Sequence, residues 1–419
     1  MTRNLGSFVT RLPAALLVLT GCAEQEPAIA PLAPPPAATV APAPAAVAEA
    51  KKEEAKPAPL TVEQKIKAYQ DGWAAYNAKD FAKFQSIWAE NATSEMLDMG
   101  APLVGPAAIT ETGAKSFANG FPDSTGELQL TLVGGANGSH IVGIVLLRGT
   151  NTGTYASPIG PVPATGKKIG LLAAHSIELN ELGKATKEVI AYDGATVAGQ
   201  LGLMQMPHRK VIDTGWIDKP VVVASGSEIE KSNLAAFNKE IEGFNKHDAA
   251  AALASAADDI VFSEASEPAD RTGKKETLKG IDEMFKAFPD AKIELSSAWS
   301  AGDYVVSSGT LSGTNTGDMP AMKLKKTGKP ISVHFIEIDK FVGGKTKNVW
   351  LFMNGAASAA QLGLLPTKAA DPNAKAGRSA PAAANKAEPA KPAGAPPTKE
   401  APPAKPAAAT KPAAPVPAK

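Results

Sequence analysis

The chain has 419 residues, 35 of them proline, and its 43 basic and 42 acidic residues nearly cancel to a formal net charge of +1. This balance provides no strong electrostatic field, so we expect no nucleic-acid partner. The single cysteine, Cys22, excludes an intramolecular disulfide.

The N-terminal segment carries two arginines, a short apolar run at 12–19, and Leu-Thr-Gly-Cys at 19–22. The run is too short to cross the ~30 Å hydrocarbon core of a bilayer, and the small residues after it are typical of a cleavage site. The pattern resembles the lipobox of bacterial lipoproteins, which implies a signal peptide at 1–21 and lipidation of Cys22. An ordinary signal peptide or a short membrane anchor with an incidental cysteine is the alternative.

The lipobox resemblance implies that a lipid anchor holds the protein in the cell envelope, with the membrane as a partner. Ala23 and Glu24 follow the cysteine. The lack of an aspartate there favours the outer membrane or the cell surface over the inner membrane.

Residues 22–59 and 368–419 consist mostly of alanine, proline and a few charged residues. Such a composition buries too little apolar surface to offset the entropy of ordering the chain, so it predicts disordered N- and C-terminal arms. The C-terminal arm repeats Lys-Pro-Ala units, and basic residues outnumber acidic ones in it. Contact with anionic lipid or a cell-wall polymer is one interpretation, and a solubilising tail is the other.

Between the arms, short strings recur in the same order, which indicates an internal duplication. The recurring strings are Asn-Ala-Lys-Asp at 77–80 and Asn-Lys-His-Asp at 245–248, Phe-Pro-Asp at 121–123 and 288–290, Gly-Thr-Asn-Thr-Gly at 149–153 and 313–317, Thr-Gly-Lys at 165–167 and 327–329, a strand histidine at His175 and His334, and Gln-Leu-Gly-Leu at 200–203 and 361–364. The duplication predicts two domains, at 60–206 and 231–367, joined by a linker at 207–230.

Each repeat begins with aromatic and aliphatic residues at helical spacing, which predicts a helix that faces the core. These residues are Ile66, Tyr69, Trp73 and Tyr76 in the first repeat, and Leu234, Phe237, Ile241 and Phe244 in the second. A second short helix is expected after Asp80 or Asp248, which are suitable N-caps. A third is expected at 106–117 or 279–287, where the Phe-Pro-Asp string ends it.

The remainder of each repeat has the pattern of β-strands. The expected strands are 127–133, 141–147, 169–179 and 187–192 in the first repeat, and 292–295, 304–308, 331–338 and 348–352 in the second. We therefore predict an α+β fold with two tandem cone-shaped domains, each with three helices on a curved antiparallel sheet. We call them the first cone and the second cone. A cone of this kind has an open pocket, and Trp73 and Tyr76 are candidate ligand contacts in it, with a core role as the alternative.

The last hairpin of each cone suggests a pair of polar residues. A turn at Lys184 would place His175 opposite Asp193, and the equivalent turn in the second cone would place His334 opposite Asn354. Opposite residues in an antiparallel pair have Cβ atoms about 5 Å apart, so a carboxylate could orient the imidazole. Both histidines could also be ordinary sheet residues.

Asp193 and the Gln-Leu-Gly string that follows it, with the Phe-Pro-Asp and Thr-Gly-Lys strings, resemble the SnoaL-like family of polyketide cyclases. That family lies in the nuclear-transport-factor-2-like superfamily of cones. The resemblance implies that Asp193 is the acid/base of an intramolecular aldol closure and that His175 polarises the carbonyl. This chemistry needs an apolar cavity, because burial raises the pKa of a carboxyl group.

The sequence also departs from the family pattern. Asn151 and Asn315 stand where the family commonly has histidine, and Asn354 replaces the aspartate in the second cone. An amide cannot take up a proton, so the second cone is expected to be degenerate and catalytically silent. Asn151, Asn315, His334 and Asn354 remain candidate ligand-binding residues. For the two Gly-Thr-Asn-Thr-Gly strings, a tight strand exit is the alternative.

Two classes of function follow. In one, both cones bind a small apolar molecule of the carbonyl type; in the other, the first cone is an acid/base enzyme of the ester or polyketide cyclase type that uses Asp193 and His175. The duplication, the lost aspartate and the surface tether favour binding, since a shared fold does not imply a shared reaction. No metal-ligand spacing or phosphate-binding loop is present, so no cofactor or metal is expected. The sequence leaves open whether the two cones pair with each other.

Overall fold

The computed structural model describes residues 57–157, 160–204, 207–320 and 325–364. These residues fall within one compact unit that begins at Pro57. The predicted signal peptide, Cys22, most of the N-terminal arm and the C-terminal arm lie outside the described residues. None of the described helices combines the length and the hydropathy needed to cross a membrane.

The first cone is built from helices followed by a sheet, as predicted. Its elements are α1 (Val62–Asn77), α2 (Phe81–Ser86), β1 (Trp88–Met96), β2 (Leu103–Val104), α3 (Pro106–Ala108), the π-helix η1 (Ile109–Lys115), α4 (Ser116–Gly120), β3 (Thr125–Gly134), the 3-10 helix η2 (Ala136–Gly138), β4 (His140–Thr150), β5 (Tyr155–Ser157), β6 (Gly160–Val162), β7 (Lys168–Leu179), β8 (Ala185–Ala191) and α5 (Gly194–Gln200). The strand order is β2-β1-β8-β7-β4-β3, and β9 (Val221–Val223) from the linker extends the sheet beside β3.

The second cone repeats this order. Its elements are α6 (Glu228–Asn245), the 3-10 helix η3 (Ala251–Leu253), β10 (Ala256–Glu264), β11 (Arg271–Thr272), α7 (Lys274–Ala287), β12 (Lys292–Ala301), β13 (Tyr304–Thr314), β14 (Pro330–Val342), β15 (Lys345–Met353) and α8 (Gly355–Gln361). The strand order is β11-β10-β15-β14-β13-β12, the same as in the first cone. The predicted α+β architecture of two tandem cones is confirmed.

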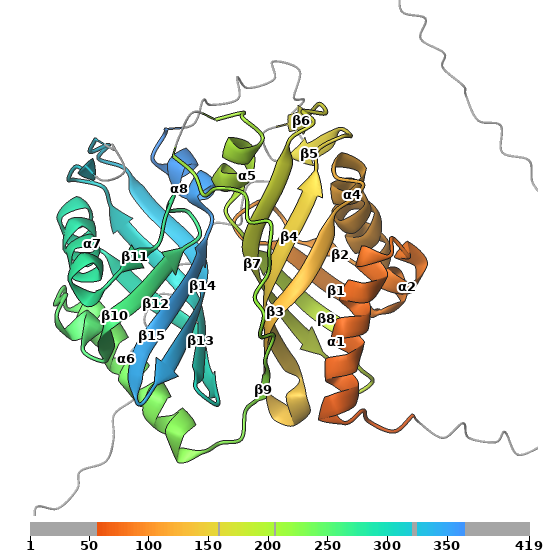
Figure 1. The fold of residues 1–419 in the computed structure, drawn as a ribbon, viewed down its shortest axis with the longest axis horizontal. Helices are drawn as coiled ribbons and strands as arrows, with labels where there is room; N and C mark the ends of the chain where they lie inside the picture. The colour runs from red at the N-terminus through yellow and green to blue at the C-terminus, as the bar shows by residue number, and fades with distance from the viewer. Residues whose placement is uncertain (1–56, 158–159, 205–206, 321–324, 365–419) are drawn as a thin grey trace, which may run out of the picture. The chain divides into compact units, whose positions relative to one another are not determined.

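The sheets contain strands that were not predicted. The first strand of each cone, β1 or β10, was not expected, and it pairs in parallel with β8 or β15, whereas the neighbouring central strands are antiparallel. In each cone the long first helix and the helices that follow it lie against one face of the sheet (Figure 1).

The long first helices begin at side-chain caps. The Thr61 hydroxyl accepts a hydrogen bond from the Gln64 backbone N–H, and the Gln64 side chain accepts one from the Thr61 N–H. Ser227 and Glu230 form the same reciprocal pair at α6. Each capping box satisfies backbone donors that the first helical turn leaves free.

Two of the recurring strings fasten the first helix to the sheet. The Asn77 side chain exchanges two hydrogen bonds of 2.8 Å with the backbone of Gly126, at the start of β3. Asn245 makes the same pair with Ile293 in β12, at 2.9 and 2.8 Å. The asparagine therefore recurs because it holds the end of the helix on the first strand of the central hairpin, β3 or β12.

The Phe-Pro-Asp strings fasten a turn in the same way. Asp123 accepts hydrogen bonds from the backbone N–H and the hydroxyl of Thr150, at 2.6 and 2.7 Å. Asp290 accepts the same two bonds from Thr314, also at 2.6 and 2.7 Å. These bonds place each aspartate in the fold and leave it no part in a ligand pocket.

The last hairpin of the first cone does not have the predicted register. His175 lies opposite Ile190, three positions from Asp193. The turn lies earlier than expected, because the Asn180 side chain accepts hydrogen bonds from the N–H groups of Leu182 and Lys184, and a bulge follows in β8. The predicted pairing of His175 with Asp193 is therefore wrong. In β14 and β15 the predicted register is observed from the pair of Lys340 with Asn348 to the last pair, Phe335 with Met353. A bulge shifts the register nearer the turn, and the predicted pair of His334 with Asn354 lies beyond the end of the ladder.

The register also corrects the alignment of the two repeats. The first glycine of each Gly-Thr-Asn-Thr-Gly string pairs with Ile169 in β7 and with Ile331 in β14. Six residues further along these strands lie His175 and Glu337. The structural counterpart of His175 is thus Glu337, and the predicted match with His334 is wrong by three positions.

The face of each sheet that is turned away from its helices contributes to a shared hydrophobic cluster. Members of that cluster are Leu130, Leu132, Val142 and Ile144 from the first cone, and Tyr304, Val306, Ile336, Ile338 and Phe352 from the second. The linker joins it through Trp216, whose ring centroid lies 5.2 Å from that of Trp350. Burial of these apolar side chains is the main stabilising contribution in this region.

Candidate functional site

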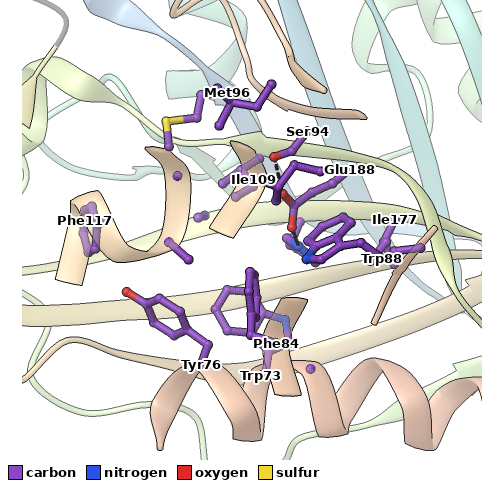
Figure 2. A pocket seen from close by; sticks show the side chains of 18 of the residues that line it. Trp73, Tyr76, Phe84, Trp88, Ser94, Met96, Ile109, Phe117, Ile177 and Glu188 are labelled. Carbon is purple, nitrogen blue, oxygen red and sulfur yellow. Dashed lines mark hydrogen bonds and ion pairs between the residues drawn. The ribbon is translucent and has the colours of Figure 1, made fainter. Parts of the chain in front are cut away.

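The helical face of the first sheet encloses a cavity of about 370 Å³. Aromatic and aliphatic side chains from α1, α2, β1, η1, α4 and β7 form most of its wall, as Figure 2 shows for Trp73, Tyr76, Phe84, Trp88, Met96, Ile109, Phe117 and Ile177. A cavity of this size and polarity is typical of a binding site for a small organic molecule.

One wall of the cavity carries a chain of buried polar side chains. His175 in β7 contacts the Tyr69 hydroxyl of α1 through Nδ1, at 3.0 Å, and Glu188 Oε1 of β8 through Nε2, at 2.6 Å. The hydroxyl of Ser94, in β1, donates to the other oxygen of Glu188 (Figure 2). All four side chains are buried and line the cavity.

Aromatic contacts fix the orientation of the imidazole. The His175 ring stacks on Tyr69 with 5.4 Å between centroids, and the Trp73 ring meets it edge-on at 5.0 Å. Burial, with a smaller contribution from the charge of Glu188, raises the pKa of Tyr69 above its ordinary value, and the Trp73 indole opposes the rise. Tyr69 therefore stays a phenol, which can donate a hydrogen bond to Nδ1, while Nε2 of the same ring faces the Glu188 carboxyl group.

Tyr76 and Trp73 both line the cavity, where the sequence placed them as candidate ligand contacts. The Tyr76 hydroxyl shares a 2.9 Å hydrogen bond with Ser124, and burial raises the pKa of Tyr76 to about 12. The indole N–H groups of Trp73 and Trp88 have no well-aligned hydrogen-bond partner within the described part of the chain.

Asp193 lies outside this cavity. It is buried at the N-cap of α5, where it accepts hydrogen bonds from the N–H groups of Ala195 (3.2 Å), Thr196 (2.7 Å) and Gly355 (3.0 Å). Burial raises the pKa of Asp193, and the hydrogen bonds from Thr196 and its neighbours oppose the rise. The structure therefore does not bring Asp193 and His175 together.

The carboxylate that does meet His175 is Glu188, which the sequence reasoning missed. The available signal was the alternation in 188–192, where Glu188 falls on the same face as the apolar Ile190 and Tyr192. A charged residue in the cavity-facing set of an otherwise apolar strand indicates a buried partner.

Asn151 and Asn315 also lie outside the cavity, fully buried. The Asn151 side-chain oxygen accepts two 2.9 Å hydrogen bonds from Thr165, through its backbone N–H and its hydroxyl. Asn315 holds Thr327 in the same way, at 2.7 and 3.1 Å. Each asparagine thus closes the long connection between two strands.

His334 and Asn354 contact the first cone instead of lining a pocket of the second. His334 Nδ1 lies 2.7 Å from Asp98 Oδ1, and the Asn354 amide donates to the Leu97 carbonyl oxygen at 3.3 Å. Asn354 also caps α8 through a 3.2 Å bond from the Ala356 N–H.

Among its described residues, the second cone does not repeat the polar chain. The places of Tyr69, His175 and Glu188 are taken by Phe237, Glu337 and Val349. Glu337 is one of a group of acids with Glu240 and Asp339, and burial together with the charge of Glu240 raises its pKa to about 7. The cavity chemistry therefore belongs to the first cone.

Solved structures with similar folds include AclR from Streptomyces galilaeus, which is 26% identical, covers 33% of this chain and 99% of its own, and gives a TM-score of 0.30. A SnoaL-like protein from Jannaschia sp. CCS1 is 15% identical, covering 33% and 97%, with a TM-score of 0.31. IdmH from Streptomyces antibioticus is 20% identical, covering 31% and 98%, with a TM-score of 0.28.

No curated protein matches the chain. The model of the SnoaL-like polyketide cyclase family matches twice, at residues 64–201 and 235–362, one match for each cone. The two matches span more than half of the 419 residues. The chain belongs to the SnoaL-like polyketide cyclase family and carries two tandem copies of its domain.

Proposed function

We propose that the first cone binds a small, mostly apolar molecule that carries a carbonyl or similar oxygen. The observation that supports this function best is the cavity of about 370 Å³ with an aromatic and aliphatic wall and one buried polar chain. Burial of apolar ligand surface against this wall is favourable. A polar atom of the ligand can form a hydrogen bond that is stronger in this low-dielectric site than in water.

The expected affinity follows from the size of the cavity. A ligand that buries roughly 250 Å² of apolar surface gains about 6 kcal/mol, at about 25 cal/mol per Å², before the entropic cost of association. A gain of about 6 kcal/mol corresponds to a Kd on the order of 40 μM before that cost is subtracted, so binding is expected in the high-micromolar to millimolar range or weaker, and titrations have to reach millimolar concentrations.

A second candidate function is acid/base catalysis in the same cavity. The observation in its favour is the 2.6 Å contact between His175 Nε2 and Glu188. An imidazole held by a carboxylate can take up a proton, because the carboxylate stabilises the imidazolium that forms. In this alternative His175 is the acid/base, Glu188 is the carboxylate that orients it in place of Asp193, and Asp193 keeps its place as a helix cap.

The location of the protein is part of the proposal. A short apolar run closed by Leu-Thr-Gly-Cys at 19–22 supports a lipid anchor on Cys22 and residence in the cell envelope, at the outer membrane or the cell surface. The C-terminal arm, rich in lysine, would contact anionic lipid or a cell-wall polymer. We further propose that the two cones work as a pair, which the shared hydrophobic cluster supports.

The test of ligand binding uses one position in the cavity wall. Ala173, two residues before His175, lines the cavity, and the second cone has Phe335 at the equivalent place. Wild type and Ala173→Phe are titrated with a panel of β-keto esters, aryl ketones and epoxides, with tryptophan fluorescence and calorimetry as readouts. Ala173→Ser, which leaves the space open, is the matched control.

We expect Ala173→Phe to weaken binding at least tenfold and Ala173→Ser to bind like wild type. Equal binding by Ala173→Phe would place the ligand elsewhere and contradict the proposal. The proposal also fails if no member of the panel binds wild type at millimolar concentration.

A further inference from the structure

The loop after β1 forms part of the cavity wall in the first cone. Met96 ends β1, and Met99, Gly100 and Ala101 line the cavity together with Met96. Leu97 and Asp98 connect them and do not line the cavity themselves. Contacts that fix Leu97 and Asp98 therefore also fix the positions of Met96 and Met99, the cavity-lining residues on either side of them.

We infer that His334 and Asn354 of the second cone are positioning residues for the cavity of the first cone, because they hold Asp98 and Leu97 in place. This inference rests on the proposed ligand-binding function. It gives the second cone a part in that function although it lacks the polar chain of the first.

The first hold is on Asp98, whose backbone needs support. Asp98 has a φ of +57°, in the left-handed region that is unfavourable for most non-glycine residues. Both of its carboxylate oxygens meet His334: Oδ2 accepts from the backbone N–H at 2.8 Å, and Oδ1 lies 2.7 Å from Nδ1. The Asp98 side chain is 13% exposed and the His334 side chain 54%, so the contact lies between a mostly buried carboxylate and an exposed imidazole.

The backbone N–H of His334 is available because β14 extends beyond β15. The last pair of that ladder is Phe335 with Met353, and Asn354 already belongs to the cap of α8. The backbone N–H of His334 therefore has no partner in β15, and it donates to the Asp98 carboxylate instead.

The second hold is on Leu97 and depends on an amide. The Asn354 side chain uses its oxygen to cap α8 and its nitrogen to donate to the Leu97 carbonyl oxygen. An aspartate could form the cap but could not donate to a carbonyl. The asparagine at 354, which the family resemblance marks as the loss of an acid, is the residue that makes this contact possible.

These contacts run from side chains of the second cone to the loop after β1 in the first cone. The register equates His334 with Leu172 and Asp98 with Ser266, so no second imidazole–carboxylate pair forms in the opposite direction. Thr196 makes a single weak contact of 3.5 Å to the Ala265 carbonyl oxygen. The imidazole–carboxylate pair, which we call the clamp, therefore acts on the loop of the first cone, whereas Arg209 of the linker holds the equivalent loop of the second cone through the Glu264 carbonyl oxygen and Asp270.

The test separates the clamp from ligand binding. The variants are His334→Ala, which removes one contact, and His334→Asn, whose amide can restore a donor toward Asp98. Asp259→Asn is the control, because it removes an exposed ion pair with Lys347 that does not touch the loop. Hydrogen–deuterium exchange of peptides covering 97–104 is measured on the full chain without ligand, and the affinity for the tightest-binding aryl ketone of the panel is measured by calorimetry.

We expect His334→Ala to speed exchange in 97–104 at least fivefold and to weaken ketone binding about tenfold, while His334→Asn recovers most of both. Asp259→Asn should leave both unchanged. Unchanged exchange in His334→Ala would overturn the clamp, and faster exchange with unchanged affinity would overturn its role in positioning the cavity. If exchange in 97–104 is faster in His334→Ala but the wild type binds no ketone, the clamp is supported and the proposed ligand-binding function is contradicted.

Discussion

Asp193 and Asn354 occupy equivalent positions in the two cones, and each caps the short helix that follows its sheet. Asp193 also accepts a 3.0 Å hydrogen bond from the N–H of Gly355, the first residue of the other helix. A Cβ added to Gly355 would lie 3.0 Å from Asp193 Oδ1, and one added to Gly194 would lie 3.5 Å from Asn354 Oδ1. The two caps thus face each other closely, and only one of them carries a charge.

This relationship predicts that Asn354→Asp destabilises the protein by about 2–4 kcal/mol at pH 8, because it brings a second buried carboxylate toward Asp193. The loss should be smaller at pH 5, since burial raises the pKa of Asp193 and one proton can be shared. Urea unfolding at the two pH values measures it. The double variant Asp193→Asn/Asn354→Asp again has a single carboxyl group at this site and should recover stability. A double variant as unstable as Asn354→Asp would contradict the explanation.

The pair of His175 and Glu188 predicts how the two candidate functions separate. Glu188→Gln keeps the shape of the side chain but cannot stabilise an imidazolium, so any turnover of a ligand from the panel should fall at least 100-fold, with affinity changed by less than about tenfold. Product formation by mass spectrometry and binding by calorimetry are the measurements. Glu178→Gln, an exposed change in the same strand as His175, is the control. Turnover that persists in Glu188→Gln would exclude this pair as the acid/base group.

The buried acids of the second cone predict a pH dependence of stability. The pKa of Glu337 is raised from 4.5 to about 7 by burial and by Glu240, with Glu264 adding to the rise and Asp339 opposing it through a hydrogen bond. The folded state holds the proton more tightly than the unfolded state, so this stabilisation is complete below pH 4.5 and is lost as the pH rises to about 7.

The measurement is the urea midpoint between pH 4 and 8 for wild type and Glu337→Gln. The variant should lose most of the decline between pH 4.5 and 7, because a neutral amide does not titrate. Glu242→Gln, an exposed change in the first helix of the same cone, should leave the decline as it is. A Glu337→Gln profile that parallels wild type would assign the effect to other groups.

The lipid anchor predicts that Cys22→Ser abolishes labelling by a fatty-acid analogue in the producing cell, because the thiol is the acylation site. Membrane fractionation should then find the variant uncleaved or soluble. Equal labelling of wild type and Cys22→Ser would remove the lipoprotein proposal.

The fold could be read from the sequence because its signals act within one cone and are repeated. Asn77, Asp123, Asn151 and Gln200 each fasten a turn or a strand end of the same cone that lies between 14 and 49 positions away in the chain, and each recurs in the second cone with the same partner atoms. Strings of this kind predict the order of elements well. They carry little information about chemistry, because their polar atoms are already used in the fold.

The site could be predicted only in part. His175 was found as a residue of the sheet interior, but its partner depended on a turn formed by Asn180 and on a bulge in β8, which hydrophobic patterning does not reveal. The contact between Asp98 and His334 joins residues 236 positions apart, so no local pattern could have indicated it. Only the folded structure brings these two side chains together.

The strand β9 shows that the boundary between the two repeats in the chain is not their boundary in space. Val221–Val223 pairs with β3, and the linker ahead of it donates from Ile212 to the Gly170 carbonyl oxygen. A fragment of the gene that stopped after α5 would leave β3 as a bare edge strand, available for pairing with other chains. The connecting segment therefore belongs to the sheet of the first cone, whereas the described part of the second cone ends its sheet at β12 without such a strand.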